Sequence, residues 1–233
     1  MGAGSNAGAP AAMKQQPQVD LIHHRRLRAV LTHHQNRAVQ SVPRTAFRKW
    51  AKTFGLGEGD KLLLESEGEL TILLDFLIYH HRQRGRTLAQ KYLAGLPPSD
   101  DPDETLVRRA MAGPRFAMFE VTESHSFTGV VVRDLVRGGT TFVVDEAMST
   151  SAKPGLLLAS RLLPLPDYWM TSGAGFPLSP EVLHTVRQVF LPTLKVVEGG
   201  ELTHLSPEAE DELAAVVIGA AMRDGTTGDI QFK

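Results

Sequence analysis

The sequence predicts an α+β fold made of an N-terminal helical bundle, a central five-stranded antiparallel small barrel and C-terminal helices. Three observations predict it. Apolar residues recur at helical spacing in the first half, short β-rich runs separated by turn residues follow Gly113-Pro114, and two Ser-Pro-Glu helix starts come last. With 42% hydrophobic residues among 233, the chain can bury a proper core. We expect residues 1–17 to be a disordered tail, 18–113 the bundle, 114–175 the barrel and 176–233 the C-terminal helices.

Five helices are expected in the bundle. The first runs from about Val19 to Val39, where apolar residues recur among Arg and His, so its polar face is basic. The third begins near Glu69, is apolar over most of its circumference and is closed by Arg84-Gly85, which makes it the expected central helix. The other three are a helix opened by Pro43 and ended by Gly55, a short one over about Thr87–Leu93, and one that starts at Pro102 and ends at Gly113.

Five short strands are expected after Gly113-Pro114, each bounded by turn residues such as Arg137-Gly138-Gly139 and Pro154-Gly155. They are Phe116–Thr122, Gly129–Leu135, Thr140–Val144, Leu156–Leu163 and Tyr168–Ser172. Five strands of about six residues suit a small closed or nearly closed barrel.

Two C-terminal helices begin with a strong signal. Ser179 and Ser206 can each cap a helix, and each is followed by a Pro that needs no amide hydrogen and a Glu that favours the helix dipole. The first helix is expected to end near Leu191-Pro192, and the second to fray from Asp224 onward.

The charges of the two halves differ in sign although the net charge is only -1. Residues 1–95 carry 14 Lys and Arg against 7 Asp and Glu, whereas residues 96–233 carry 11 against 19. This division predicts either an anionic partner for the first half or charge-matched packing between the two halves.

Nine histidines without a cysteine raise the question of a metal site, because six of them form the adjacent pairs at 23–24, 33–34 and 80–81. No two histidines have the i, i+4 spacing that suits zinc on a helix. We therefore expect solvated histidines on a basic face, with no metal and no cofactor. A site assembled from two helices, with His80 or His81 meeting one of the first four histidines, stays open.

Catalytic motifs are absent from the sequence. No G-x-S-x-G serine elbow is present, and Glu123-Ser124-His125-Ser126 is typical of a hairpin connection. Gly55-Leu56-Gly57 follows a helix and lacks the G-K-[ST] of a phosphate loop. Acid pairs such as Asp145-Glu146 are expected to be solvated in loops. Without cysteines, signal peptide or long apolar run, a cytoplasmic protein with no membrane contact is expected.

Several runs in the middle of the chain carry a resemblance. They are Leu74-Asp75-Phe76-Leu77-Ile78-Tyr79, the stretch from Gly85 to Leu93, Phe119-Glu120-Val121, Val132-Arg133-Asp134-Leu135, the stretch from Ser149 to Leu163, and Ser172-Gly173. Over about residues 70–180 the chain resembles a group of uncharacterised bacterial proteins, many of which carry a SecA-like C-terminal zinc motif (SEC-C). The resemblance implies a helical region followed by a small β-barrel. The zinc motif, which implies docking to ribosomes or other protein partners, is absent here because the chain has no cysteine.

The sequence favours a non-catalytic binding or adaptor protein whose basic helical face contacts nucleic acid or an acidic protein partner. The predicted contact residues are the arginines of two basic clusters: Arg25, Arg26, Arg28, Arg37, Arg82, Arg84 and Arg86. One alternative is a hydrolase-type enzyme with a His/carboxylate site between bundle and barrel, using His80, His81 or His125. The other is a structural or oligomer-forming protein with an exposed apolar patch around the last helix.

Overall fold

The computed structural model describes residues 19–58, 61–190, 192 and 205–228, so the predicted tail at 1–17 lies outside the described residues. Five helices form the first part: α1 (Leu21–Val39), α2 (Arg44–Thr53), α3 (Glu67–Tyr79), α4 (Leu88–Ala94) and α5 (Pro102–Ala112). Two small hairpins join them, β1 (Gly57–Glu58) with β2 (Lys61–Leu62), and β3 (Arg82–Gln83) with β4 (Arg86–Thr87). No described helix is long and apolar enough to cross a membrane.

The end of α3 corrects one prediction. The helix stops at Tyr79, and the residues expected to complete it form the β3–β4 hairpin instead. Arg84 and Gly85 make the turn, with φ of 55° and 76°. Both values lie in the left-handed region, which a continuing right-handed helix does not use. Arg84-Gly85 therefore marks a hairpin turn and not the end of a helix.

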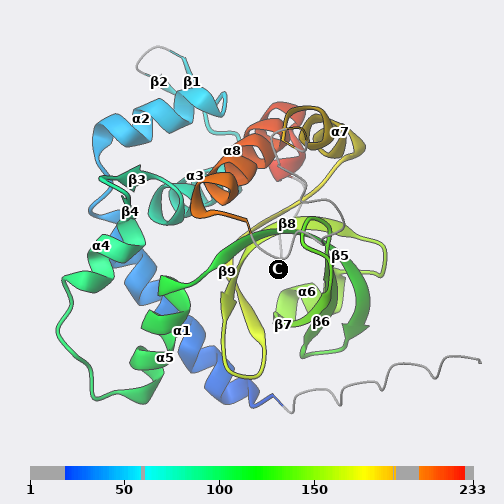
Figure 1. Cartoon of the computed structure of the whole chain (residues 1–233). Coiled ribbons are helices and arrows are strands. Elements are labelled where there is room, and N and C mark those ends of the chain that lie inside the picture. The colour runs from blue at the N-terminus through cyan, green and yellow to red at the C-terminus, as the bar shows by residue number, and fades with distance from the viewer. Residues whose placement is uncertain (1–18, 59–60, 191, 193–204, 229–233) are drawn as a thin grey trace, which may run out of the picture.

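A closed five-stranded barrel follows, in the order β5-β6-β7-β9-β8 (Figure 1). Its strands are β5 (Arg115–His125), β6 (Gly129–Asp134), β7 (Thr140–Val144), β8 (Leu157–Pro164) and β9 (Trp169–Pro177), and each predicted strand is found at its place. The prediction of a hairpin connection at 123–126 is wrong for Glu123, Ser124 and His125, which pair with β6 as the last residues of β5. The prediction that all of them are antiparallel is wrong, because β7 and β9 pair in parallel. A closed ring with an odd number of strands cannot alternate direction all the way round, so one neighbouring pair must be parallel.

The inside of the barrel is a packed core and not a channel. Inward residues of four strands meet there, and Met148 of α6 (Glu146–Ser151) joins them from the connection between β7 and β8. Gly129 allows β6 to approach β7 closely, because a Cβ at that position would lie 2.2 Å from the carbonyl oxygen of Val143. The barrel interior consists of Ala117, Phe119, Val121, Val130, Val132, Val143, Met148, Ala152, Leu158 and Leu162.

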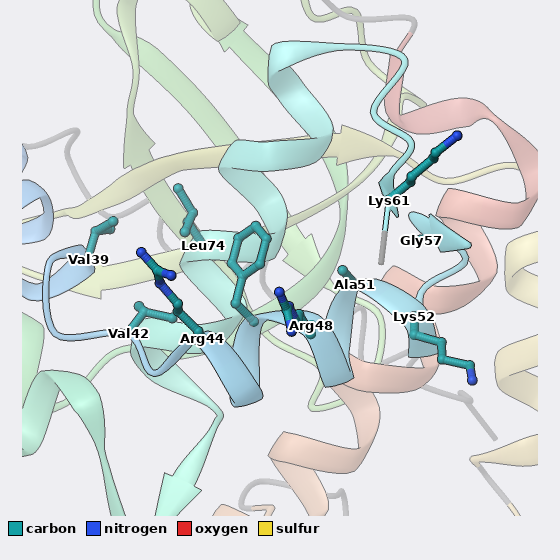
Figure 2. Close-up of a pocket in the computed structure, with 10 residues that line it drawn as sticks. Val39, Val42, Arg44, Arg48, Ala51, Lys52, Gly57, Lys61 and Leu74 are labelled. Carbon is teal, nitrogen blue, oxygen red and sulfur yellow. The ribbon is translucent and has the colours of Figure 1, made fainter. Parts of the chain in front are cut away.

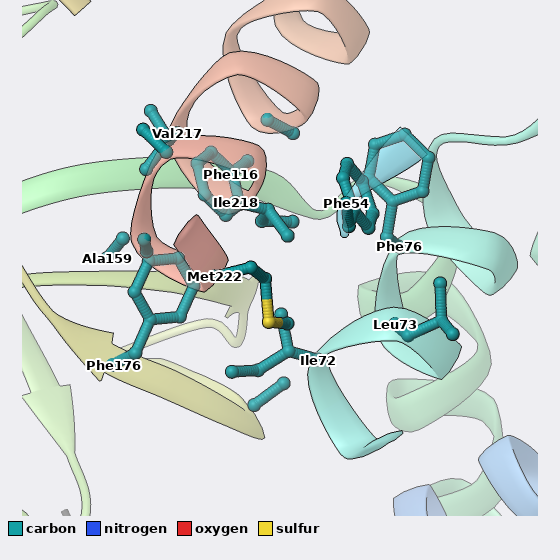
Figure 3. Packing of buried hydrophobic residues seen from close by; sticks show 14 of the residues in the cluster. Phe54, Ile72, Leu73, Phe76, Phe116, Ala159, Phe176, Val217, Ile218 and Met222 are labelled. Atoms are coloured by element: carbon teal, nitrogen blue, oxygen red, sulfur yellow. The ribbon is translucent and has the colours of Figure 1, made fainter. Parts of the chain in front are cut away.

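The outside of the barrel supplies a second core under the helices. Phe116, Ala159 and Phe176 pack against α2, α3 and the C-terminal helix α8 (Pro207–Asp224), as Figure 3 shows. A third cluster joins α1, α4 and α5 to the ends of β8 and β9. Because α3 contributes to both helical clusters, bundle and barrel pack as one continuous body (Figure 1).

The two C-terminal helices begin where the sequence predicts. Ser179 caps α7 (Pro180–Val189) by accepting the amide of Val182, and Ser206 caps α8 by accepting the amide of Ala209. The second helix continues to Asp224 and is followed by the single turn η2 (Thr226–Gly228). Both helices lie against the barrel on the side away from α1 (Figure 1).

Candidate functional site

Two arginines of α1, Arg25 and Arg26, pair with carboxylates from the acidic half of the same chain. Arg25 donates from Nε and Nη2 to the two carboxylate oxygens of Glu146, at 2.8 and 2.5 Å. The Nε of Arg26 lies 3.7 Å from a carboxylate oxygen of Asp103. Of the two explanations for the charge division, charge-matched packing between the halves therefore describes these residues.

Two more of the predicted contact arginines are also used internally. Arg28 donates to the main-chain carbonyl of Thr171 at 2.5 Å. Arg82 donates from Nε to the carboxylate of Asp211 on α8, also at 2.5 Å. The remaining three, Arg37, Arg84 and Arg86, are exposed and form no ion pair with another described residue.

The expectation of solvated histidines is wrong for three of them. His24, His34 and His80 are 3, 3 and 4% exposed, because each lies on the inward face or at the inward end of its helix. Burial lowers the pKa of both His24 and His80 to about 4, so these rings are neutral at pH 7. Each has a polar partner for Nδ1: the Tyr168 hydroxyl for His24 at 3.2 Å, the Tyr92 hydroxyl for His34 at 2.8 Å, and the Asp211 carboxylate for His80 at 2.8 Å.

No metal site is formed within the described part of the chain, where no cluster of three or more His, Asp and Glu could hold an ion. The histidines of the enzyme hypothesis have separate partners. The ring of His81 accepts the indole N–H of Trp50 at 3.3 Å, and Nε2 of His125 lies 3.4 Å from Glu123. His80 lines a cavity in which a carboxylate is also present.

One candidate site is a cavity of about 450 Å³ beside α2, which we call the α2 groove. Arg44, Arg48 and Lys52 recur every four residues, a spacing that places them on one face of the helix. Figure 2 shows Val39 and Val42 at one end of the groove and Gly57 and Lys61 at the other. Its lining residues are Val39, Val42, Arg44, Phe47, Arg48, Ala51, Lys52, Gly57, Lys61 and Leu74.

The α2 groove combines an apolar wall with a cationic rim. Val42, Phe47 and Leu74 are half-buried, whereas the four cations are exposed and none of the described lining residues is acidic. The volume lies in the range of small-molecule sites, which are lined mostly by apolar groups with a few polar ones that set orientation. Such a site suits a group that joins an apolar body to a negative charge.

Sequence reasoning did not select the α2 groove, although a signal was present. Arg44, Arg48 and Lys49 belong to the positive charges counted in residues 1–95, but arginines are denser in α1 and the β3–β4 hairpin, where the contact surface was predicted. The spacing of Arg44, Arg48 and Lys52 against the apolar positions Phe47 and Ala51 is the pattern of an amphipathic helix with a cationic outer face. That spacing could have identified α2.

A second cavity, of about 200 Å³, lies where α3, the β3–β4 hairpin, β8 and α8 meet, and we call it the junction cavity. Its charged lining residues are balanced in sign: Arg82 and Arg161 stand with Glu210 and Asp211. Arg161 is 1% exposed and donates from Nε and Nη2 to one oxygen of Asp75, at 2.9 and 2.8 Å.

The fold and these cavities define a mixed α and β protein, with helices packed on a closed five-stranded barrel and a cation-rimmed groove of ligand-binding size. The chain belongs to a family of unknown function, DUF7986, whose model matches residues 19–201. The expectation of an uncharacterised family is confirmed at that level. Searches of the curated proteins and of the solved structures found no match.

Proposed function

We propose that this chain is a non-catalytic binding or adaptor protein that takes an acidic segment of a partner protein in the α2 groove. The observation that carries the proposal is the pairing of a cationic rim with an apolar wall in one cavity of about 450 Å³. A carboxylate of the partner would meet Arg44 or Lys52, and a neighbouring apolar side chain would pack on Phe47 and Leu74. Charge complementarity speeds and orients such an encounter, and the apolar anchor adds affinity.

An acidic protein suits the surface better than nucleic acid does. A nucleic acid needs a track of cations that neutralises several phosphates, with aromatic rings on which bases stack when the strand is single. Four of the seven predicted contact residues are already engaged within the chain: Arg25, Arg26 and Arg82 meet carboxylates, and Arg28 holds a main-chain carbonyl. The groove itself has one lining aromatic residue among those described, Phe47.

The two alternative functions have less support. His80 and Asp211 do lie within hydrogen-bond reach in a cavity, as the hydrolase-type hypothesis requires. A pKa near 4 makes His80 a weak base at neutral pH, however, and no described hydroxyl is hydrogen-bonded to it. An oligomer-forming apolar patch on α8 also lacks support, because none of the large exposed hydrophobic residues in the described chain lies on that helix.

The test is fluorescence anisotropy with three labelled probes: a peptide of alternating Glu and Leu, a peptide of Glu alone, and a single-stranded RNA. We expect the Glu/Leu peptide to bind most tightly, because only it fills the apolar wall, and its affinity to fall as salt rises. Reversing two charges, Arg44→Glu with Lys52→Glu, should weaken binding of this peptide by at least about tenfold.

The matched control reverses two exposed charges elsewhere, Arg109→Glu with Lys153→Glu. This variant has the same net charge as the groove variant. Equally weakened peptide binding in both would therefore show a general charge effect and contradict binding in the α2 groove. Equal affinity for the two peptides would contradict the apolar anchor. Tight RNA binding that the groove variant alone abolishes would replace the acidic protein by nucleic acid as the partner.

A further inference from the structure

The α2 groove follows one face of α2 over about two helical turns. Its lining residues on this helix have the spacing i, i+3, i+4, i+7 and i+8, which is a single continuous stripe. They are Arg44, Phe47, Arg48, Ala51 and Lys52. At 1.5 Å per residue, the stripe from Arg44 to Lys52 is about 12 Å long. Figure 2 shows Arg44, Arg48 and Lys52 in this order along the helix.

Two cations and two apolar side chains along this stripe can contact a partner. The side chains of Arg44 and Lys52 are exposed, and neither forms an ion pair or a hydrogen bond with another residue that the structure describes. Phe47 of α2 and Leu74 of α3 are half-buried, so part of their apolar surface stays accessible. A partner that lies along the groove therefore meets a cation near each end of the stripe, with apolar surface beside them.

We propose that the acidic partner segment is an amphipathic α-helix that lies along α2 and carries an acidic residue at every fourth position. This inference rests on the proposed function and adds the conformation of the partner. Acidic residues four positions apart on a helix are separated by about 6 Å along its axis, which is the same step that separates the cations of α2. Apolar residues three or four positions apart form a neighbouring stripe, which would pack on Phe47 and Leu74.

The walls of the groove favour a helix over an extended segment. An extended segment gains affinity from main-chain hydrogen bonds to an exposed strand edge. Between the two ends of the groove, however, the described lining residues come from α2 and α3, whose main-chain groups are bonded within each helix. An incoming helix needs no strand edge, because its own main-chain hydrogen bonds are internal as well.

The size of the groove determines how deep such a helix can lie. A helical segment about 11 Å in diameter and about 12 Å long occupies about 1,100 Å³, which is more than twice the cavity volume of about 450 Å³. Only the apolar stripe of the partner would therefore enter the groove. Its acidic residues would stay at the rim, where Arg44 and Lys52 are exposed.

The first experiment compares two labelled peptides of identical composition, built from Glu, Leu and Ala, by fluorescence anisotropy on the full chain. In one peptide Glu recurs at every fourth position with Leu on the neighbouring stripe. In the other, Glu and Leu alternate in the centre and Ala stands at both ends. The helical pattern should bind at least about tenfold more tightly.

The outcomes separate the helix from the proposed function. Equal affinity of the two peptides, or tighter binding of the alternating peptide, would overturn the helix and leave an acidic partner in the α2 groove intact. Binding by neither peptide would overturn both.

The second experiment measures the conformation of the bound peptide. The peptide with the helical pattern carries ¹³C at the Cα atoms of its central residues, and its chemical shifts are recorded with an excess of unlabelled protein. Helical shifts are expected in the complex, and extended shifts there would overturn the proposal.

The third experiment compares two charge reversals on α2. Lys52 lines the groove, whereas Lys49 is an equally charged, exposed residue of the same helix that does not line it. Lys52→Glu should weaken binding of the helical-pattern peptide about fivefold, and Lys49→Glu should change it less than about twofold. Equal effects of the two substitutions would overturn the placement of the partner along this stripe.

Discussion

Protonation of the buried His80 should make the fold sensitive to mild acid. The ring packs between Phe76 and Phe116, with ring centroids 5.4 and 5.8 Å away, and burial is the main cause that lowers its pKa from 6.5 to about 4. The charge of Arg161 lowers the pKa further, while the carboxylates of Asp211 and Asp75 oppose the shift.

The direction and the size of this change in stability follow from the linkage between proton binding and folding. Because the unfolded chain binds the proton more readily than the folded one, the stabilisation is fully present above about pH 6.5 and is lost as the pH falls towards 4. A difference of 2.5 pKa units, at about 1.36 kcal/mol per unit, corresponds to about 3 kcal/mol in full. About 2 kcal/mol of this is already lost at about pH 5.

The assay is urea unfolding at about pH 7.5 and about pH 5, on the unsubstituted chain and on His80→Asn. Asn retains an N–H that can donate to Asp211 but does not titrate in this range. The unsubstituted chain should therefore lose about 2 kcal/mol more than the variant on acidification. The comparison isolates His80, because His24, His34 and the other histidines are present in both proteins.

An equal loss of stability in the two proteins would refute this reasoning. It would mean that the proton goes to other groups, or that the folded protein admits water to His80 and keeps its pKa near 6.5. If His80→Asn is less stable at both pH values but its stability depends on pH as that of the unsubstituted chain does, the result would show only that the side chain matters for packing.

Three further predictions concern stability. Arg161→Leu should destabilise the fold by about 3–5 kcal/mol, because it leaves Asp75 buried without its partner. The double variant Arg161→Leu/Asp75→Leu should recover part of this stability. A loss under about 1 kcal/mol in the single variant would contradict the prediction. Gly129→Ala should cost about 1–3 kcal/mol, since its Cβ would lie 2.2 Å from the Val143 carbonyl, and unchanged urea unfolding would argue against close approach. Ser66→Ala should cost about 1 kcal/mol through loss of the α3 cap, measured as a lower Tm.

The parts of the fold that the sequence predicted well are those that local signals determine. Ser179 and Ser206 cap helices through bonds to amides three residues on, and both helix starts are confirmed. The five strands are separated by turn residues whose backbone preference is local as well, such as Gly138 and Gly155, both at positive φ.

The errors lie where distant residues decide the outcome. The parallel pairing of β7 with β9 arises from closure of the ring, which no strand encodes by itself. The short helix α6 was missed because Asp145 reads as a solvated acid, whereas it caps that helix and accepts the hydroxyl of Thr171 at 2.7 Å. Glu146 beside it pairs with Arg25, a contact between residues 121 positions apart.

The same distinction between local signals and distant residues explains why the sequence did not identify the candidate site. The count of arginines identified α1 and the β3–β4 hairpin as basic, but a count does not show which carboxylates the fold will bring to them. Three of the seven meet acids from the second half, so much of the charge division serves packing between the halves.

The outward cations of α2 differ from those of α1 because of how the helix is packed. Its buried positions, Ala46 and Ala51, face the cluster that includes α3, and the charges at Arg44 and Lys52 are left exposed on the other side. Neither of these two forms an ion pair with a described residue, so the part of the acidic half that the structure describes does not neutralise them. Binding at this groove should therefore depend strongly on salt, while the ion pairs of α1, which are exposed and individually weak, should change the stability of the fold only slightly under the same salt.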